Sequence, residues 1–340
     1  KNHHSIRNLW INDGGQITKN PMRPLVQDLD SLPIPSYGNE SYYFIDNDQI
    51  TRNDPVLNYN FLSVHASRGC PFTCSYCVNS LLHPFFKELG PYIRMRSVSN
   101  VIKEIKQFRK VDEIYFIDEV FTTNKTWIEE FTARYKNEIG VPFTIWLNPL
   151  MISSILINKL ANAGLSTIRF GIQTGSDKMR NELFNRPGNN EQIKDIAKKI
   201  TEHKVTITYD LIMDNPYETE KSLEEAIELL LQLPKPLSFS LFSLQFFPKY
   251  PLTVKAIEDR YIHINEMDAD KLFKRTSKNF GFVPKLLPYS RKQVRQNIIW
   301  LITQNRVENS IIKFSVFGSS LISQIVLNYL NLKSIILGKM

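Results

Sequence analysis

Three cysteines, Cys70, Cys74 and Cys77, are the only thiols of this 340-residue chain, and they lie within one short segment. A turn this tight places Cα atoms poorly for a disulfide bond, and one thiol would be left over. Thiolates at this spacing suit an iron–sulfur cluster in which protein sulfur binds three irons and the fourth stays open. An open iron is a place where chemistry can occur.

A zinc ion is an alternative ligand for these thiols, with His65 or His83 completing the set. Zinc motifs tend to come as paired cysteine knuckles, however, and the chain has no second pair. Unliganded thiols are a further alternative. A fully ligated electron-transfer cluster would need a fourth cysteine, which the chain lacks.

Residues 67–77, which read SRGCPFTCSYC, resemble the signature of the radical S-adenosylmethionine enzymes. This resemblance implies that the three cysteines hold a [4Fe–4S] cluster whose open iron binds S-adenosylmethionine. It further implies that cleavage of this cosubstrate releases a 5′-deoxyadenosyl radical, and that Tyr76 shields one edge of the cluster. Gly69 and Pro71 suit a tight loop after a strand.

From residue 61 onward, short apolar runs alternate with helical periods, which indicates parallel strands joined by right-handed crossovers. The resemblance implies an α/β fold, a partial (β/α)6 barrel like that of other radical S-adenosylmethionine enzymes. We therefore expect the functional groups at the carboxyl ends of the strands. The expected strands are 61–66, 113–117, 143–147, 167–172, 206–213 and 239–246. The expected helices are 98–109, 125–138, 153–163, 190–202 and 222–233.

Three regions are expected along the chain. Residues 61–252 form the core barrel, and residues 253–340 form a mainly helical extension that is a candidate substrate region. Residues 1–60 read as an extended linker, because each residue before a proline is biased away from helix. In the cobalamin-dependent branch of the family, a segment similar to 23–35 joins an upstream cobalamin-binding domain to the barrel. We expect that domain to be absent from this chain.

Polar residues at the expected strand ends carry the rest of the resemblance. Asp118 and Glu119 are adjacent carboxylates that can grip an ammonium group, and the resemblance implies the amino group of S-adenosylmethionine. Gln173 offers donors and an acceptor for the ribose hydroxyls of S-adenosylmethionine. Arg186 offers a planar guanidinium, which the resemblance implies binds the carboxylate of the same cosubstrate. Asp210 is a candidate for the adenine side of the cofactor site. Further candidates are Asp214, Glu218, His65, Arg94, Arg96 and Asn148.

The net charge of +8 resides in the C-terminal region, residues 253–340, without aromatic interleaving or a recognised nucleic-acid module. A solvated basic face is therefore expected, with no nucleic-acid partner. Residues 314–332 carry no charge but too many polar side chains for a comfortable membrane span. The expected partners are a small-molecule or lipid-like substrate and an electron donor such as flavodoxin or ferredoxin, in the cytoplasm.

Three functional hypotheses follow. The first is methyl transfer, with cobalamin relaying the methyl group in the full-length protein. The second is a radical rearrangement, cyclisation or other modification without cobalamin. The third, from a different class, is a non-catalytic iron–sulfur electron carrier or sensor. The sequence identifies neither the catalytic residues nor the substrate.

Overall fold

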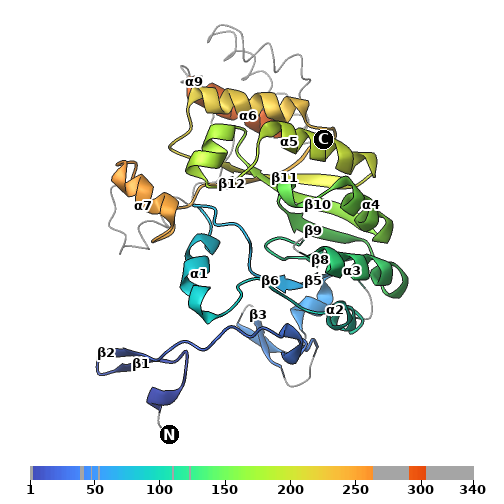
Figure 1. The fold of residues 1–340 in the computed structure, drawn as a ribbon, viewed down its shortest axis with the longest axis vertical. Coiled ribbons are helices and arrows are strands. Elements are labelled where there is room, and N and C mark those ends of the chain that lie inside the picture. The colour runs from blue at the N-terminus through green and yellow to red at the C-terminus, as the bar shows by residue number, and fades with distance from the viewer. Residues whose placement is uncertain are drawn as a thin grey trace.

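The computed structural model of the protein describes residues 3–38, 42–46, 48–52, 54–108, 111–121, 124–262 and 291–303. Its centre is a six-stranded sheet in the order β12-β11-β10-β9-β8-β5, in which all neighbouring strands run parallel (Figure 1). The expected α/β half-barrel is therefore confirmed. The strands are β5 (Phe61–Val64), β8 (Glu113–Phe116), β9 (Phe143–Leu147), β10 (Leu165–Gln173), β11 (Thr206–Met213) and β12 (Ser238–Ser243).

Helices connect successive strands and cover one face of the sheet (Figure 1). The sequence patterns predicted all five of them, and the bounds of α3 and α5 agree with the expected ranges. The helices are α2 (Val98–Ile105), α3 (Lys125–Glu138), α4 (Ser154–Ala163), α5 (Asn190–Glu202) and α6 (Glu220–Gln232).

The helix-covered face of the sheet is the hydrophobic core. Strand side chains alternate between the two faces, so Phe116, Phe143 and Phe170 all point toward the helices and are fully buried. Phe131 of α3 lies between two of these rings, with centroid distances of 5.3 Å to Phe116 and 5.6 Å to Phe143. We call the other face of the sheet the inner face. It carries the strand side chains that lie between the core residues in sequence and point away from the helices.

Helix ends follow their local sequence. Asn189 and Thr219 each form a capping box, in which the cap side chain and the third helical residue satisfy each other's backbone N–H. Gly164 ends α4 in the left-handed conformation, with φ of 114°, which a residue with a side chain adopts only under strain.

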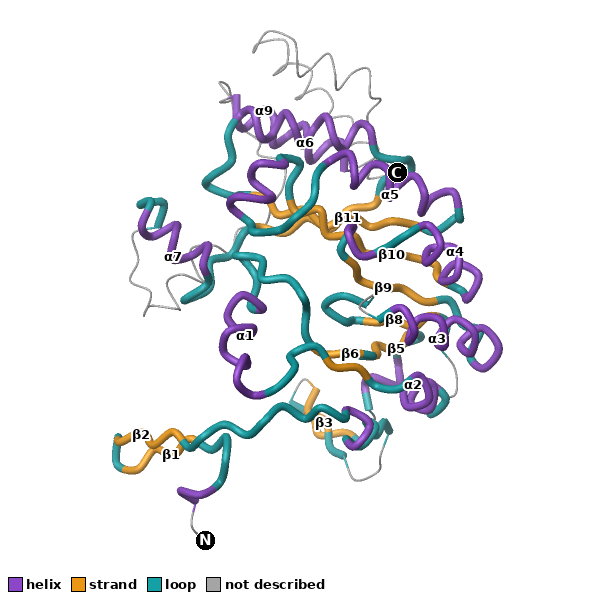
Figure 2. Tube along the Cα trace, viewed as in Figure 1, coloured by secondary structure: helices purple, strands orange, loops and turns teal. Residues whose placement is uncertain are grey.

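Two short strands and a helix lie on either side of the cysteines in the sequence, and the sequence patterns did not predict them. Figure 2 shows the first of these strands and the helix, labelled β6 and α1. Strand β6 (Ser67–Arg68) pairs antiparallel with β7 (Arg94–Met95), and α1 (Asn79–Phe86) begins directly after the last cysteine. Two-residue strands are too short to show a hydrophobic period. Helix α1 has no side-chain cap at its start and carries Pro84 in its interior, so it lacks the usual sequence signals of a helix.

The N-terminal region carries two antiparallel hairpins in addition to extended chain. They are formed by β1 (Trp10–Asp13) with β2 (Gln16–Lys19), and by β3 (Phe44–Asp46) with β4 (Gln49–Thr51). The linker is tied to the barrel where Asp30 accepts a hydrogen bond from the Ser97 backbone N–H at 3.0 Å.

Beyond the barrel, the structure describes α7 (Pro251–Glu258) and α9 (Arg291–Thr303). Helix α9 packs against α6, where Arg295 forms an ion pair with Glu224. Among the described residues, no helix is long and apolar enough to cross a membrane. The uncharged segment 314–332 lies outside the described residues.

Candidate functional site

The cysteine loop follows β6 and is anchored to the connection between β10 and α5. The Ser75 backbone N–H donates to the Phe184 carbonyl at 2.9 Å, and the Ser75 hydroxyl donates to the Leu183 carbonyl at 2.6 Å. From the next residue of the connection, the Asn185 amide donates to the Thr73 carbonyl at 3.0 Å. Two segments more than a hundred residues apart in sequence are thereby held together.

Each cysteine sulfur accepts one N–H donor. Cys70 Sγ accepts from the Phe72 backbone at 3.5 Å, Cys77 Sγ from the Asn79 amide at 3.6 Å, and Cys74 Sγ from the Arg186 guanidinium at 3.7 Å. Donors aimed at sulfur favour the thiolate over the thiol, and such bonds to sulfur are a feature of iron–sulfur sites.

Burial opposes that tendency at Cys70. It raises the pKa of the Cys70 thiol to about 11, the Phe72 N–H lowers it in part, and Cys74, Cys77 and Glu119 raise it further. Without a bound metal the thiol therefore keeps its proton at neutral pH. A metal must displace that proton, so metal loading is linked to proton release.

Gly69 sets the conformation that leads into the loop. Its φ is +91°, and a Cβ at this position would lie 2.5 Å from the Tyr92 carbonyl oxygen. Only glycine fits both the backbone angle and the close approach. Its place before Cys70 had already indicated a tight loop from the sequence.

Arg186 connects the cysteine loop to the end of β10. Its Nη2 and Nε both donate to the Gly171 carbonyl, at 2.6 and 3.1 Å, while Nη1 reaches Cys74 Sγ. A Cβ on Gly171 would lie 2.5 Å from Gln173 Nε2 and 3.1 Å from Arg186 Nη2. The absence of a side chain at Gly171 therefore makes room for the side chains of Gln173 and Arg186. Their roles at a cosubstrate stay predictions.

Tyr76 packs inside the loop. Its ring meets Phe184 edge to face, with centroids 4.9 Å apart. Burial raises the pKa of Tyr76, which Arg186 only partly offsets. The Tyr76 hydroxyl is thus neutral at physiological pH and lies near Cys74, while a shielding role for the ring stays a prediction.

Asp118 is a buried carboxylate that organises the backbone. It accepts hydrogen bonds from the Ala66 N–H at 3.3 Å and from both the N–H and the hydroxyl of Ser67. Burial raises its pKa, while these three donors lower it. The contacts position the strand that leads into the cysteine loop, and they occupy the oxygens expected to meet an amino group.

Glu119 is exposed and lines a pocket of about 550 Å³ between the cysteine loop and the linker. Gly69, Tyr92, Arg94 and His65 line the same pocket. Of the two carboxylates predicted from the sequence, Glu119 is the one free to meet a ligand.

The remaining candidates lie elsewhere. Asp210 lies on the inner face and pairs with Arg169 at 2.9 Å. Arg96 forms an ion pair with Glu104, which gives it a structural role. Glu218 lies beside α9, where Lys292 donates to its carbonyl at 3.0 Å.

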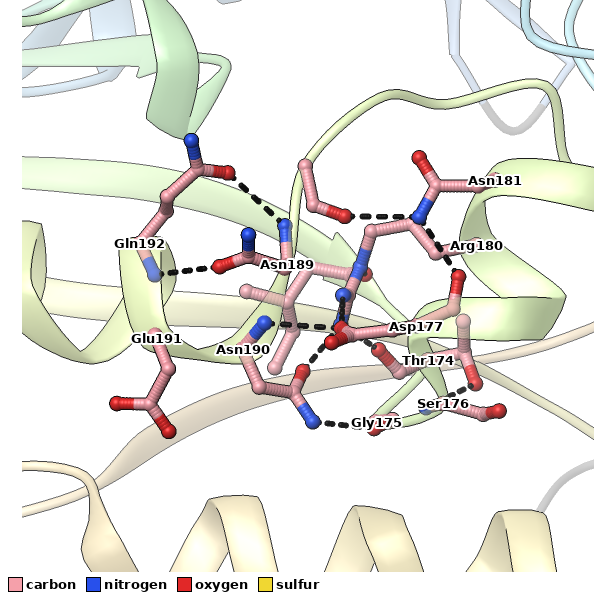
Figure 3. A network of polar contacts seen from close by, with 12 residues as sticks. Thr174, Gly175, Ser176, Asp177, Arg180, Asn181, Asn189, Asn190, Glu191 and Gln192 are labelled. Atoms are coloured by element: carbon pink, nitrogen blue, oxygen red, sulfur yellow. Dashed lines mark hydrogen bonds and ion pairs between the residues drawn. The ribbon is translucent and has the colours of Figure 1, made fainter.

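Sequence reasoning missed Arg180, which is 2% exposed and orders the turn after β10 (Figure 3). It forms an ion pair with Asp177, and its Nη2 donates to the Thr174 carbonyl and, at 2.8 Å, to Asn190 Oδ1. The i,i+3 spacing of Asp177 and Arg180 was a signal that could have identified the pair.

A parallel half-barrel with three cysteines at its carboxyl end defines a barrel enzyme built around a metal-binding loop. Residues 64–230 match the family described as the radical SAM superfamily. The match covers slightly less than half of the chain and includes the cysteine loop and most of the half-barrel, so this part of the chain is similar to radical SAM domains. The superfamily implies a [4Fe–4S] cluster and S-adenosylmethionine as cofactors.

Curated relatives include an uncharacterized methyltransferase, PH0819, of Pyrococcus horikoshii, 28% identical over 232 residues. That match covers 67% of this chain and 47% of the relative. The cytidylyl-2-hydroxyethylphosphonate methyltransferase of Streptomyces wedmorensis is 25% identical over 189 residues, covering 52% of this chain and 33% of the relative. The chain thus spans less than half the length of these relatives.

Two solved structures share the fold. The cobalamin-dependent S-adenosylmethionine radical enzyme OxsB superposes with a TM-score of 0.63 at 15% identity, covering 98% of this chain and 52% of OxsB. The radical S-adenosylmethionine methyltransferase TsrM of Kitasatospora setae gives 0.61 at 17% identity, covering 76% of this chain and 51% of TsrM.

The cysteine loop fits a cluster better than a single ion. Among the described residues, no three of His, Cys, Asp and Glu form a group that could hold one metal ion. A cubane asks for a different arrangement, because each thiolate binds its own iron. Three sulfurs of one loop, each with an N–H donor, meet that requirement in chemistry and in number.

Proposed function

We propose that this chain is the catalytic barrel of a cobalamin-dependent radical S-adenosylmethionine methyltransferase. The observation that carries the proposal is the Arg186 guanidinium, which bonds the Gly171 carbonyl on one side and Cys74 Sγ on the other. It joins the cysteine loop to the strand end that carries Gln173. Methyl transfer is supported by the two curated relatives, both named as methyltransferases.

In this proposal Cys70, Cys74 and Cys77 bind the cluster, and Tyr76 shields it. When bound and reduced, the cluster supplies the electron that cleaves S-adenosylmethionine to a 5′-deoxyadenosyl radical. Arg186 orients the cosubstrate carboxylate, because its planar fork matches that group. The functional residues of this chain bind and orient, while the cofactor carries the difficult chemistry.

The remaining residues act around the cosubstrate. Gln173 meets the ribose, and the exposed carboxylate of Glu119 meets the amino group. Asp118 does not contact the cosubstrate in this proposal. It acts indirectly, by accepting hydrogen bonds that fix the backbone of Ala66 and Ser67. Asp210 is assigned to the inner face rather than to the immediate surroundings of the cluster.

The proposed partners are a small-molecule or lipid-like substrate and an electron donor such as flavodoxin or ferredoxin. Cobalamin is proposed to be bound mainly by an upstream domain of a longer protein. The similarity to OxsB, a cobalamin-dependent enzyme, and to TsrM, whose structure holds cobalamin, supports that part of the proposal.

The test is anaerobic reconstitution with iron and sulfide, followed by reduction in the presence of S-adenosylmethionine. We expect close to four irons per chain and the formation of 5′-deoxyadenosine. Cys77→Ala should abolish that product. Arg134→Gln, which changes a half-buried ion pair on α3, is the matched control and should behave like the wild type.

A wild-type protein that binds no cluster, or that binds one and leaves S-adenosylmethionine intact, contradicts the proposal. Methyl transfer is tested separately, by adding cobalamin to the reconstituted longer protein and following a labelled methyl group. Formation of 5′-deoxyadenosine with no dependence on cobalamin would favour a cobalamin-independent radical modification instead.

A further inference from the structure

Five side chains form a continuous band across the inner face of the sheet. Tyr115 of β8 lies next to Trp146 of β9, with ring centroids 6.3 Å apart, and the Arg169 guanidinium of β10 lies 5.1 Å from the Trp146 centroid. Arg169 Nη2 then donates to Asp210 of β11 at 2.9 Å and to Ser240 of β12 at 2.7 Å. We call these five residues the inner-face band.

The band is accessible and differs in chemistry from the core behind it. All five residues are half-buried. On the same strands, the neighbours that point the other way, such as Phe116, Ile145 and Ile168, are fully buried among the helices. A sheet face needed only for packing would carry apolar side chains, so the aromatic rings and the ion pair need another explanation.

Arg169 has hydrogen-bonding capacity that the described residues do not use. Both protons of Nη2 are taken by Asp210 and Ser240, whereas Nε is buried and has no partner within the described part of the chain. Two residues beyond Trp146, at the end of β9, the Asn148 side chain is 1% exposed and its Nδ2 likewise has no partner there. A buried donor without an acceptor is costly, by about 1–3 kcal/mol.

These groups specify the chemistry of a ligand. The Arg169 side chain is only half-buried, and its guanidinium favours a ligand that carries a carboxylate. The Tyr115 and Trp146 rings offer planar surface, on which another ring stacks or packs edge to face. Asp210 remains paired with Arg169, which holds the guanidinium in place against Trp146.

The band is close to the proposed cofactor site. Gly171, whose carbonyl is held by Arg186, lies two residues beyond Arg169 on the same strand. Two strand residues span about 7 Å. A ring bound on the band therefore lies near the strand end where the cosubstrate is proposed to bind.

We propose that the inner-face band binds the substrate, and that this substrate is a planar aromatic or conjugated ring bearing a carboxylate. This inference rests on the proposed function, and it adds the substrate class. Arg169 binds the carboxylate, and Trp146 with Tyr115 binds the ring.

The experiment is a calorimetric titration of the anaerobic, reconstituted protein with 2-naphthoate as the probe. Two further probes separate the contributions, since 2-naphthalenemethanol lacks the carboxylate and cyclohexanecarboxylate lacks the planar ring. We expect saturable binding of 2-naphthoate and at least about tenfold weaker binding of the other two probes. 2-Naphthalenemethanol loses the charged hydrogen bond to Arg169, which is worth about 1.5 kcal/mol. Cyclohexanecarboxylate loses the planar ring that packs on Trp146 and Tyr115.

Variants locate the site. Arg169→Gln should weaken 2-naphthoate binding about tenfold, and Arg169→Lys, which keeps the charge but loses the fork, should fall between it and the wild type. Trp146→Leu should weaken 2-naphthoate and 2-naphthalenemethanol by the same factor. Arg134→Gln is the matched control and should bind like the wild type. Thermal unfolding of each variant shows whether it is folded.

Wild-type protein that does not bind 2-naphthoate, or that binds cyclohexanecarboxylate equally well, overturns the inference. A folded Arg169→Gln variant with unchanged 2-naphthoate affinity overturns it as well. The proposed function is read from a different quantity, the 5′-deoxyadenosine formed by the wild type. Loss of that product with naphthoate binding intact contradicts the function and leaves the binding site standing.

Discussion

The two faces of the central sheet are built from the same strands but follow different rules. On β10, Ile168, Phe170 and Ile172 point toward the helices and are fully buried, whereas Arg169 and Gln173 point to the inner face and are half-buried. The helix-covered face is explained by burial of apolar surface alone. The inner face carries charge, amides and half-exposed aromatic rings, which burial does not explain.

This difference separates residues that hold the fold from residues that act. Substitutions on the helix-covered face should mainly lower the stability of the protein. Substitutions on the inner face should mainly weaken the binding of the proposed ligands. The first of the four predictions below tests that division directly, and the four run from the largest expected effect to the smallest.

Phe170→Ala should lower the free energy of unfolding by about 4 kcal/mol, because it leaves a cavity in a fully buried position. Trp146→Ala, on the neighbouring strand but on the inner face, should lose less than half as much, since part of the ring is already in contact with solvent. Urea unfolding of both variants gives the comparison. Equal losses would remove the distinction between the faces.

Gly69→Ala should destabilise the protein by about 2 kcal/mol, because a Cβ forces the loop away from the Tyr92 carbonyl. Its iron content after reconstitution should fall as well. Gly14→Ala is the matched control, since Gly14 also has a positive φ but nothing lies within 4 Å of its Cβ position. If Gly14→Ala lowers the iron content equally, the effect does not arise at the cysteine loop.

Thr144→Val should cost about 1 kcal/mol, because the buried Thr144 hydroxyl donates to Glu113 Oε1 at 2.6 Å. Thr208→Val is the comparison, since its hydroxyl meets the neutral Ser238 hydroxyl at 3.2 Å in a half-exposed position. It should cost less. The reverse order in urea unfolding would show that the charge of Glu113 adds nothing to its hydrogen bond.

Glu218→Gln should show a small, pH-dependent effect. Burial raises the pKa of Glu218 from its model-peptide value of 4.5 to about 7, so the folded protein favours the neutral acid. That contribution to stability is complete below pH 4.5 and is lost as the pH rises through 7. The Tm of Glu218→Gln relative to the wild type should therefore rise between pH 5 and pH 8, while the exposed Glu182→Gln shows no such trend.

The sequence was sufficient for the strand and helix framework, because that framework is periodic. The ranges 143–147, 206–213, 125–138 and 190–202 agree with β9, β11, α3 and α5 as observed. The roles assigned to the cysteines, Gln173 and Arg186 stay predictions, and they rest on the expectation that parallel strand ends meet at one edge of a sheet.

Other features depend on contacts that no local pattern records. The Arg169–Asp210 pair joins residues 41 positions apart, and the buried Arg180 lies in a short π-helix with no clear hydrophobic period. Asp118 and Glu119 are adjacent in sequence, yet one is buried and the other exposed. Sequence alone treated them as equivalent, since nothing local shows that Ser67 turns its backbone toward the first of them.

The anchoring of the cysteine loop has a consequence for how the protein acquires iron. Ser75 is bonded on both sides, to the Phe184 and Leu183 carbonyls and, through its own carbonyl, to the Leu252 N–H at 3.0 Å. None of these bonds involves a metal, so we expect the loop to keep its shape before a cluster is inserted, unlike a zinc finger, which folds only when its ion arrives. Cluster insertion should then follow folding rather than drive it.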